Sequence, residues 1–280
     1  MRSVYMLMHQ RKPDVNGLAT RVLQALKHAH IAVAAEPWIR ERLDGEALAS
    51  LSELTPEQCE AVLSVGGDGT LLRANALAVR CNLPLLGVNV GRVGFLTEVE
   101  LDRLEEACAR LANEEYTLET RMMLKASMGD RTDYALNDVV LSRGGYSRLI
   151  GVNAWVDGDR VGPFIADGLI VSTPTGSTGY SLSAGGPLVC PEGECMVLTP
   201  ICAHSLQHRP VVTSAAQTIT VRLDGGYSAM VSVDGRKPWG FSSGQTLTIT
   251  KAEHAARFIR LGSKSFFSTI RIKLSEWTRS

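Results

Sequence analysis

The sequence has no excess of charge of either sign, because 29 Lys and Arg residues balance 29 Asp and Glu residues. Such a chain lacks the basic field with which proteins bind the phosphate backbone of nucleic acids, and it contains no basic run that resembles a nucleic-acid-binding arm. We therefore expect no nucleic-acid partner. If the chain binds phosphate groups, local backbone geometry must provide the binding site.

Long apolar stretches are also missing, so the sequence predicts no membrane partner. The first eight residues lack the length and the cleavage site of a signal peptide and indicate a first strand. Six cysteines occur without a Cys-x-x-Cys pair, which favours reduced thiols and a cytoplasmic location. Cys190, Cys195, Cys202 and His204 match no common zinc spacing, so we predict free thiols there rather than a metal site.

The length of 280 residues and the hydrophobic content of 45% predict two domains with ordinary cores. In the first part of the chain, expected strands alternate with expected helices, which is typical of a doubly wound parallel α/β sheet. The strands are expected at residues 4–8, 31–34, 61–65 and 84–89, and the helices at 17–30, 70–80 and 101–112. Ligands of such sheets bind beyond the carboxyl ends of the strands. Two glycine-bearing turns, at 66–69 and 87–94, follow strands at such ends.

The pattern changes near residue 116, where apolar and polar residues begin to alternate with period two. These runs lie at residues 134–141, 152–156, 169–172, 218–223, 229–233 and 246–250. Asp-Gly pairs at 157–158, 224–225 and 234–235 are typical hairpin turns. The sequence therefore predicts a mainly antiparallel β C-terminal domain, a sandwich, after the α/β N-terminal domain. The expected boundaries are 1–114 for the α/β domain, 115–257 for the β-rich domain and 258–280 for a C-terminal segment.

The most informative motif is Gly66-Gly67-Asp68-Gly69-Thr70, which directly follows the apolar strand at 61–65. The glycines bring bare backbone close to a ligand, and the N–H groups at the turn and helix start attract anions. Asp68 would repel a phosphate group unless it holds a metal or accepts a hydroxyl proton. This combination suggests a kinase. From these residues alone, a simple strand–helix turn with Asp68 as a helix cap is an equally good interpretation.

Two further segments carry polar residues in a pattern that suits a nucleotide. Residues 167–187 place small, hydroxyl and glycine residues after a strand, so a planar ligand can approach the backbone and Tyr180 can stack on a ring. A structural Ser/Thr-rich loop is the alternative, although long loops of compact domains are usually functional. In Asn137-Asp138 the amide can pair with adenine and the acid can accept from ribose hydroxyls. A strand-end turn explains that pair equally well.

With these segments in this order, the chain resembles the NAD kinase family over nearly its whole length. The glycine motif alone is shared with phosphofructokinases and lipid kinases, whereas residues 167–187 are far more specific. The resemblance rests on residues 66–70, 91–97, 137–138, 167–187, 199–201, 204–206, 209–210 and 266–267.

The resemblance implies ATP-dependent phosphorylation of the 2′-hydroxyl of the adenosine ribose of NAD, giving NADP and ADP. A divalent ion, Mg²⁺, would bridge the ATP phosphates. Asp68 would be the catalytic acid/base; because an aspartate with a pKa near 4 is a weak base for an alcohol, it would orient the hydroxyl and take its proton late. The resemblance implies that the binding residues are Gly67, Gly69, Arg73, Phe95, Asn137, Asp138, Arg148, Asp167, Thr178, Gly179, Tyr180 and Ser183.

The resemblance further implies a homo-oligomer, a dimer or tetramer that associates through the β domain, and a C-terminal segment that packs back on the first domain. Three residues depart from the family pattern. Asp138 replaces a Glu, Gly179 replaces an Ala, and Ile165 stands where a basic residue is common. We expect these departures to affect substrate affinity more than the catalytic chemistry, because the expected catalytic acid, Asp68, is retained.

Several alternatives explain parts of the sequence. A lipid or sugar kinase would use the same glycine turn but has no obvious need for the Asn137-Asp138 pair. A non-catalytic NAD(P)-sensing module would keep the pocket but has no need for Asp68. A Rossmann dehydrogenase is disfavoured because the third glycine of its fingerprint is missing, and a P-loop enzyme because no Gly-x-x-x-x-Gly-Lys-Ser/Thr motif occurs.

Overall fold

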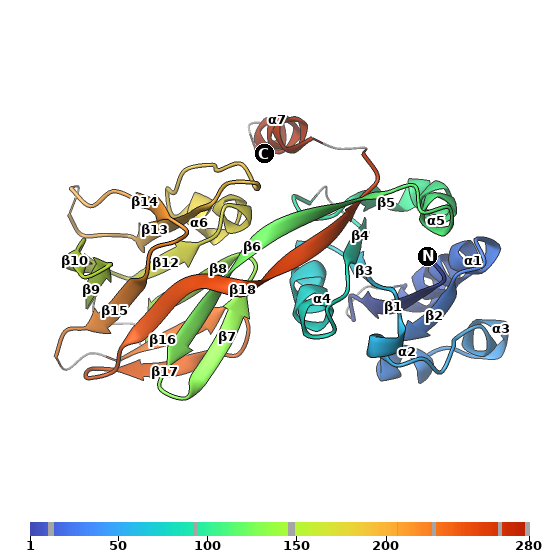
Figure 1. Ribbon diagram of the computed structural model, residues 1–280, viewed down its shortest axis with the longest axis horizontal. Helices are drawn as coiled ribbons and strands as arrows, with labels where there is room; N and C mark the ends of the chain where they lie inside the picture. The colour runs from blue at the N-terminus through green and yellow to red at the C-terminus, as the bar shows by residue number, and fades with distance from the viewer. Residues whose placement is uncertain are drawn as a thin grey trace. The chain divides into compact units, whose positions relative to one another are not determined.

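The computed structural model describes residues 1–10, 14–91, 94–144, 149–205, 207–225, 228–262 and 265–277. The chain forms two compact units (Figure 1). The first consists of Met1–Thr120 together with Ala256–Ser280, and the second of Arg121–Ala255. The chain therefore leaves the first unit once and later returns to it.

The first unit is built on a parallel sheet in the order β2-β1-β3-β4, which confirms the predicted doubly wound α/β fold. Strand β5 pairs with β4 in parallel. The last part of β18 also pairs with β4 in parallel, with Phe258 opposite Leu85. The strands are β1 (Ser3–Met8), β2 (Ala32–Ala35), β3 (Ala61–Gly66), β4 (Leu85–Asn89), β5 (Val99–Glu100) and β18 (Leu247–Arg260). Gly66 of β3 lies opposite Asn89 of β4, so both glycine-bearing turns follow the same edge of the sheet.

Helices cover both faces of this sheet, which explains why every residue of β3 is buried. Helices α1 and α5 pack with each other, and their apolar residues share one core with Leu63 and Val65 of β3. Helix α4 packs on β3 and β4 through buried residues such as Leu71, which are not part of that core. The helices are α1 (Val15–His28), α2 (Pro37–Arg40), α3 (Gly45–Ala49), α4 (Asp68–Arg80), α5 (Leu104–Ala112) and α7 (Phe266–Trp277), with 3-10 turns at Pro56–Gln58 and Leu101–Arg103.

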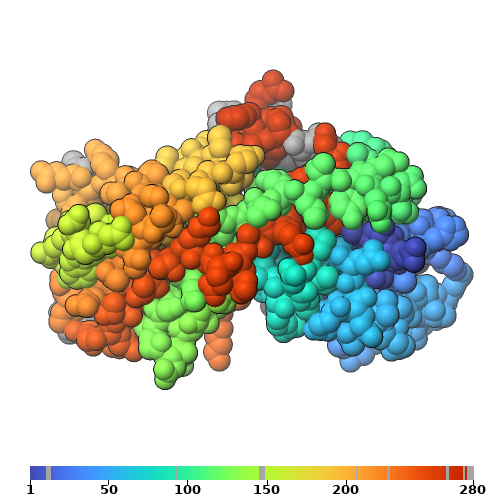
Figure 2. All heavy atoms as spheres, in the orientation of Figure 1, coloured from blue at the N-terminus to red at the C-terminus, as the bar shows by residue number. Residues whose placement is uncertain are grey.

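The second unit contains two layers of antiparallel strands, as the alternating pattern predicts. One sheet has the order β14-β13-β12-β8-β16-β17; in the other, β10-β9-β15-β18 are neighbours, β11 pairs with β9, and β6 pairs with β18 and β7. The strands are β6 (Thr117–Met128), β7 (Arg131–Ala135), β8 (Asp138–Arg143), β9 (Ile150–Val156), β10 (Asp159–Arg160), β11 (Phe164–Ala166), β12 (Gly168–Ser172), β13 (Cys195–Ile201), β14 (Val211–Ser214), β15 (Ile219–Leu223), β16 (Ser228–Val233) and β17 (Trp239–Ser242). Apolar side chains of both sheets form one core. The space-filling view shows β6 in green alongside β18 in red and orange (Figure 2).

One predicted strand is interrupted. The alternation at residues 134–141 predicts a continuous strand, whereas the structure ends β7 at Ala135 and begins β8 at Asp138. Between them, the N–H groups of Leu136 and Asn137 leave the strand ladder and donate to the side chain of Asp234. The resulting turn lies in the segment that the sequence singles out for nucleotide binding.

Candidate active site

The glycine motif of the first unit forms the turn between β3 and α4. The strand ends at Gly66, and Asp68 is the first residue of the helix. A Cβ atom at Gly66 would lie 2.4 Å from the Thr70 hydroxyl oxygen, so only glycine fits there. Around Gly67 and Gly69 an added Cβ would meet nothing within 4 Å. The N-terminus of α4 is therefore open, and its N–H groups can receive an anion.

The Asp68 carboxylate is held by the loop that follows β4. Phe95 N–H donates to Oδ2 at 2.9 Å, and Leu96 N–H donates to Oδ1 at 3.2 Å. This approach requires a glycine at position 94, because a Cβ there would lie 2.1 Å from Asp68 Oδ1. A carboxylate offers about four acceptor positions, so two remain for a ligand hydroxyl. Asp68 is thus oriented and can still accept a hydrogen bond from a ligand hydroxyl.

The hydroxyl of Thr97 lies in the same small region. Its oxygen would be 2.9 Å from a Cβ at Gly94, and it is buried without a hydrogen-bond partner. Residues 91–97 carry part of the family resemblance, but the sequence assigns no individual role to Gly94 or Thr97. Gly94 and Thr97 lie close to Asp68 only because two turns meet at one edge of the sheet. A local sequence pattern cannot predict such a contact.

Arg73, which the resemblance assigns to phosphate binding, has its charge compensated within the first unit. Its guanidinium donates to both carboxylate oxygens of Glu36, at 2.8 and 3.1 Å, and to the carbonyl of Met8. A phosphate group would have to compete with Glu36 for this arginine. Phe95 lies with its ring 5.9 Å from the Lys273 ammonium. Arg148, the other predicted arginine, is outside the described residues.

In the second unit, the turn between β7 and β8 carries Asn137 and Asp138. The Thr173 hydroxyl donates to the Leu136 carbonyl at 2.6 Å, and Thr173 N–H donates to the Asn137 carbonyl at 2.9 Å. Gly176 packs so closely that an added Cβ would lie 2.0 Å from the Asn137 carbonyl oxygen. The Asn137 side-chain oxygen Oδ1 is buried and has no hydrogen-bond partner. The amide is therefore available to a ligand while its backbone is fixed.

Asp138 is 7% exposed. Burial, and then the neighbouring negative charge of Asp234, raise the pKa of Asp138 to about 7. Burial also raises the pKa of Asp234, although three backbone N–H donors and Arg236 oppose that shift. Asp138 consequently changes its charge near neutral pH, unlike an ordinary surface aspartate.

The segment after β12 lies beside these two residues. It forms a 3-10 turn at Thr175–Thr178 and the short helix α6 (Tyr180–Ser183). A Cβ at Gly179 would lie 3.5 Å from Asn137 Nδ2 and 3.8 Å from Asp138 Oδ2, so the structure brings Gly179 together with the predicted pair. Thr178 is partly buried, whereas Tyr180 is 47% exposed and Ser183 is exposed.

Asp167 is not brought to this group. In the ladder between β12 and β8, Ser172 lies opposite Asp138, whereas Asp167 precedes Gly168 at the other end of β12. Five residues of extended strand correspond to roughly 16 Å. Asp167 instead pairs with Arg143, whose Nε lies 3.2 Å from Asp167 Oδ1.

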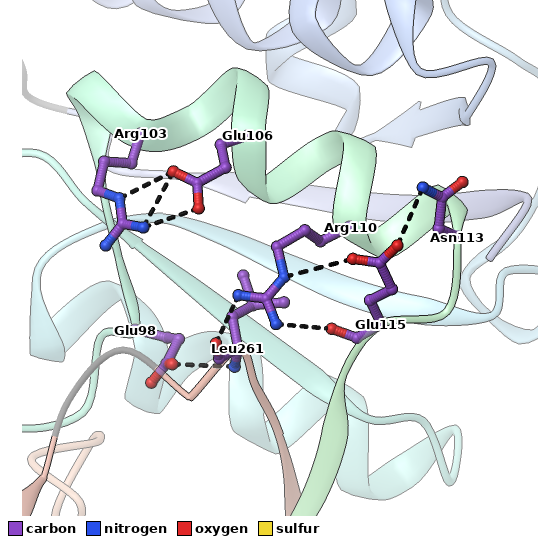
Figure 3. Close-up of polar contacts among 7 residues, drawn as sticks. All are labelled: Glu98, Arg103, Glu106, Arg110, Asn113, Glu115 and Leu261. Atoms are coloured by element: carbon purple, nitrogen blue, oxygen red, sulfur yellow. Dashed lines mark hydrogen bonds and ion pairs between the residues drawn. The ribbon is translucent and has the colours of Figure 1, made fainter.

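A cavity of about 70 Å³ elsewhere in the first unit contains none of the predicted site residues. It lies between α5, β5 and the end of β18 (Figure 3). Charged residues around it already have partners in the protein: Arg103 donates to Glu106, and Arg110 donates to the Leu261 carbonyl at 2.6 Å. These groups support the fold rather than a ligand.

The α/β unit thus presents an open helix N-terminus with an oriented carboxylate, and the β-sandwich unit presents a polar turn with an unpartnered amide oxygen. The ATP-NAD kinase N-terminal domain model matches residues 4–116, and the ATP-NAD kinase C-terminal domain model matches residues 136–261. The chain belongs to the ATP-NAD kinase family.

Individual relatives agree with this assignment. An NAD kinase of Gemmatimonas aurantiaca is 46% identical over 231 residues, which cover 80% of this chain and 79% of that protein. An NAD kinase of Moorella thermoacetica is 39% identical over 281 residues, covering 99% and 90% of the two chains. Among solved structures, an NAD kinase from Archaeoglobus fulgidus in complex with ATP has a TM-score of 0.78 at 31% identity, covering 97% of this chain and 99% of that chain. A yeast NADH kinase complexed with NADH shares the fold, with a TM-score of 0.82 at 24% identity over 97% of this chain and 86% of that chain.

Proposed function

We propose that the chain transfers the γ-phosphoryl group of ATP to the 2′-hydroxyl of the adenosine ribose of NAD, giving NADP and ADP. The main support for this proposal is the position and orientation of the Asp68 carboxylate. Two backbone N–H groups hold its carboxylate at the start of α4, between two glycines with open space around them. Membership of the ATP-NAD kinase family supports NAD and ATP as the substrates.

The mechanism follows from the nature of phosphoryl transfer. Its transition state is loose, so the protein acts mainly by positioning the reactants and neutralising charge. Asp68 accepts a hydrogen bond from the 2′-hydroxyl and so orients it. As the bond from the ribose oxygen to the γ-phosphorus forms and the bond from that phosphorus to ADP breaks, the hydroxyl proton passes to Asp68. The N–H groups of Phe95 and Leu96 keep the carboxylate in place during this step.

The remaining roles concern binding. Gly67 and Gly69 leave room for phosphate groups beside the first turn of α4. Asn137 contacts the adenine, for which its unpartnered buried oxygen is suited, and Asp138 accepts from a ribose hydroxyl. The other binding residues of the proposal are Arg73, Phe95, Arg148, Asp167, Thr178, Gly179, Tyr180 and Ser183.

The proposed metal ion is Mg²⁺, which typically binds through substrate phosphates and one or two carboxylates. Among the described residues, no group of three or more His, Cys, Asp and Glu side chains could hold a metal ion. In the proposal the ion is carried on the ATP phosphates, and Asp68 binds the ribose hydroxyl. When bound, the ion neutralises phosphate charge.

The proposal also includes a cytoplasmic location and a homo-oligomer, either a dimer or a tetramer. All six cysteines are free thiols, which supports a reducing compartment. In the part of the chain that the structure describes, no helix has both the length and the apolar character needed to cross a membrane. Size-exclusion chromatography with light scattering measures the oligomeric state directly.

One assay tests the activity. The purified protein is incubated with NAD, ATP and Mg²⁺, and NADP is measured with an NADP-specific dehydrogenase; we expect NADP only when all components are present. Parallel reactions replace NAD by a lipid or a sugar phosphate, or ATP by polyphosphate. Phosphorylation of the lipid or sugar without NADP formation would overturn the proposal. Binding of NAD without turnover would instead identify a sensing module.

A further inference from the structure

Two Asp-Gly turns of the second unit have nearly the same backbone conformation but different surroundings. Asp157 and Asp234 both adopt left-handed φ values, 50° and 48°, and each is followed by a glycine with positive φ. The Asp157 carboxylate accepts one N–H group, that of Thr218 at 2.8 Å. The Asp234 carboxylate accepts three. Turn formation therefore explains Asp157 fully, whereas Asp234 has an additional set of partners.

The three donors to Asp234 belong to consecutive residues of the β7–β8 turn. Leu136 N–H donates to Oδ2 at 2.7 Å, and the N–H groups of Asn137 and Asp138 donate to Oδ1 at 2.8 and 3.1 Å. In return, Asp234 N–H donates to the Asp138 carbonyl at 3.0 Å. Leu136 and Asn137 lie between two strands, so the strand ladder gives their N–H groups no partner. Unpaired buried N–H groups are costly, and Asp234 removes that cost.

Other contacts hold the same turn from further directions. Thr173 binds the carbonyl groups of Leu136 and Asn137 on the other side of the backbone. Arg236, two residues after Asp234, pairs with Asp133 at 2.8 Å and also donates to the Tyr134 carbonyl. The backbone of the turn is thus fully engaged. By contrast, the Asn137 side-chain oxygen is buried without a partner.

The arrangement places two carboxylates close together, so that the charge of Asp234 adds to burial, the larger cause, in raising the pKa of Asp138. A neutral acceptor at position 234 would avoid this repulsion. However, a neutral side chain lacks two equivalent acceptor oxygens for three donors, and hydrogen bonds to a charged acceptor are about twice as strong as neutral ones. The unfavourable proximity is therefore a consequence of fixing the turn firmly.

We propose that Asp234 is a positioning residue for the dinucleotide: its carboxylate fixes the backbone of Leu136–Asp138 so that the Asn137 and Asp138 side chains are presented to NAD. This inference rests on the proposed function, and it adds a residue that touches neither substrate. Its consequence is selective, since a loosened turn impairs binding of NAD more than binding of ATP.

The variant Asp234→Asn tests this inference, with Asp157→Asn as the matched control. The introduced amide turns an NH₂ group toward one of the three N–H donors, so that donor loses its acceptor. We expect the KM for NAD to rise about tenfold or more, which corresponds to the loss of about one such hydrogen bond. The KM for ATP should change by less than about twofold, and Asp157→Asn should leave both KM values unchanged.

The outcomes separate the inference from the proposed function. Absence of NADP formation by the wild-type protein would overturn the proposed function and this inference with it. With an active wild type, an unchanged KM for NAD in Asp234→Asn, or equal rises in the KM values for NAD and ATP, would overturn the inference alone. If thermal unfolding shows that Asp234→Asn does not fold, Arg236→Met weakens the same turn from its other end. A selective rise in the KM for NAD then supports the inference, and an unchanged KM overturns it.

Discussion

The two aspartates at the centre of the proposal have opposite surroundings. Asp68 is partly exposed, and two N–H groups orient it at the start of a helix. Asp138 is almost fully buried beside a second carboxylate. The first environment suits a group that orients a hydroxyl of a substrate. The second suits a group whose charge depends on pH and on what binds next to it.

Replacing Asp68 by Asn tests its catalytic role. The amide keeps the shape of the side chain but cannot accept a proton, so we expect kcat to fall at least about 100-fold. Circular dichroism should report an unchanged fold, because α4 is held by the burial of Leu71 and its neighbours rather than by this side chain. The coupled NADP assay measures the rate. A kcat close to that of the wild type would remove Asp68 from the mechanism.

Asp138 predicts a pH dependence of stability. Its pKa is about 7 in the folded protein, against 3.8 for an unperturbed side chain. The folded state therefore binds more protons than the unfolded state between these values, and the free energy of unfolding falls as the pH rises from about 4 to about 7. The contribution is up to about 4 kcal/mol.

Urea unfolding at pH 5 and pH 8 measures this effect. Asp138→Asn cannot ionise, so the loss of stability between the two pH values should be smaller in this variant than in the wild type. The same pH slope in both proteins would show that Asp138 is ionised throughout.

Residue chemistry allowed part of the site to be predicted. Glycine spacing and the acid at position 68 identified the β3–α4 turn, and the structure brings Gly179 beside Asn137 and Asp138. The role of Asp234 was not predicted, because an Asp-Gly pair in a β domain already has a sufficient explanation as a hairpin turn. Its partners lie 96 to 98 residues away, and no local pattern reports such a contact.

At the scale of elements, sequence periodicity located helices α1, α4 and α5 and many of the strands, but it missed α7, the short helices and the long strand β6. It also did not show where a strand breaks. The expected helix at 17–30 is observed at Val15–His28, where Asp14 caps the N-terminus by accepting from Gly17 N–H at 2.9 Å. The expected strand at 134–141 is divided, although its alternation continues through the break. The interruption comes from long-range partners, Asp234 and Thr173, which compete successfully with the strand ladder.

The contact between the 3-10 turn after β12 and the β7–β8 turn predicts the effect of Gly176→Ala. An added Cβ would lie 2.0 Å from the Asn137 carbonyl oxygen, so one backbone segment must move. We expect a loss of about 2 kcal/mol of unfolding free energy and a raised KM for NAD. Urea unfolding and the coupled assay measure these effects.

Gly240→Ala is the matched control, because an added Cβ at Gly240 would meet nothing within 4 Å. This control substitution should change neither the unfolding free energy nor the KM for NAD. Equal behaviour of the two variants would show that the tight approach of Gly176 has no consequence for the site.

At the scale of the whole molecule, β6 and β18 carry the chain out of the first unit and back into it. Arg260, near the end of β18, lies between two carboxylates of the first unit. Its Nη1 is 3.0 Å from Glu98, which is 3% exposed, and its Nε donates to Glu119. Glu98 also accepts from Leu261 N–H at 3.0 Å (Figure 3). These contacts fix the returning strand.

Replacing Glu98 by Gln tests how much this fixation matters. The partly buried Arg260 would lose the buried one of its two carboxylate partners, and we expect a loss of about 3 kcal/mol of unfolding free energy. Differential scanning calorimetry measures the loss. As a control, Glu106→Gln removes the exposed pair with Arg103 and should leave the unfolding transition where it is. A comparable effect of the two substitutions would contradict a special role for the returning strand.

Because the first unit is discontinuous in sequence, its folding during synthesis on the ribosome follows an unusual order. Nascent chains usually fold from the N-terminus onward, one domain after another. Here, residues 1–120 emerge long before Phe258, the residue that completes the ladder beside β4. The second unit is therefore complete in sequence before the first one, and the first unit can reach its final state only after Phe258 has been synthesised.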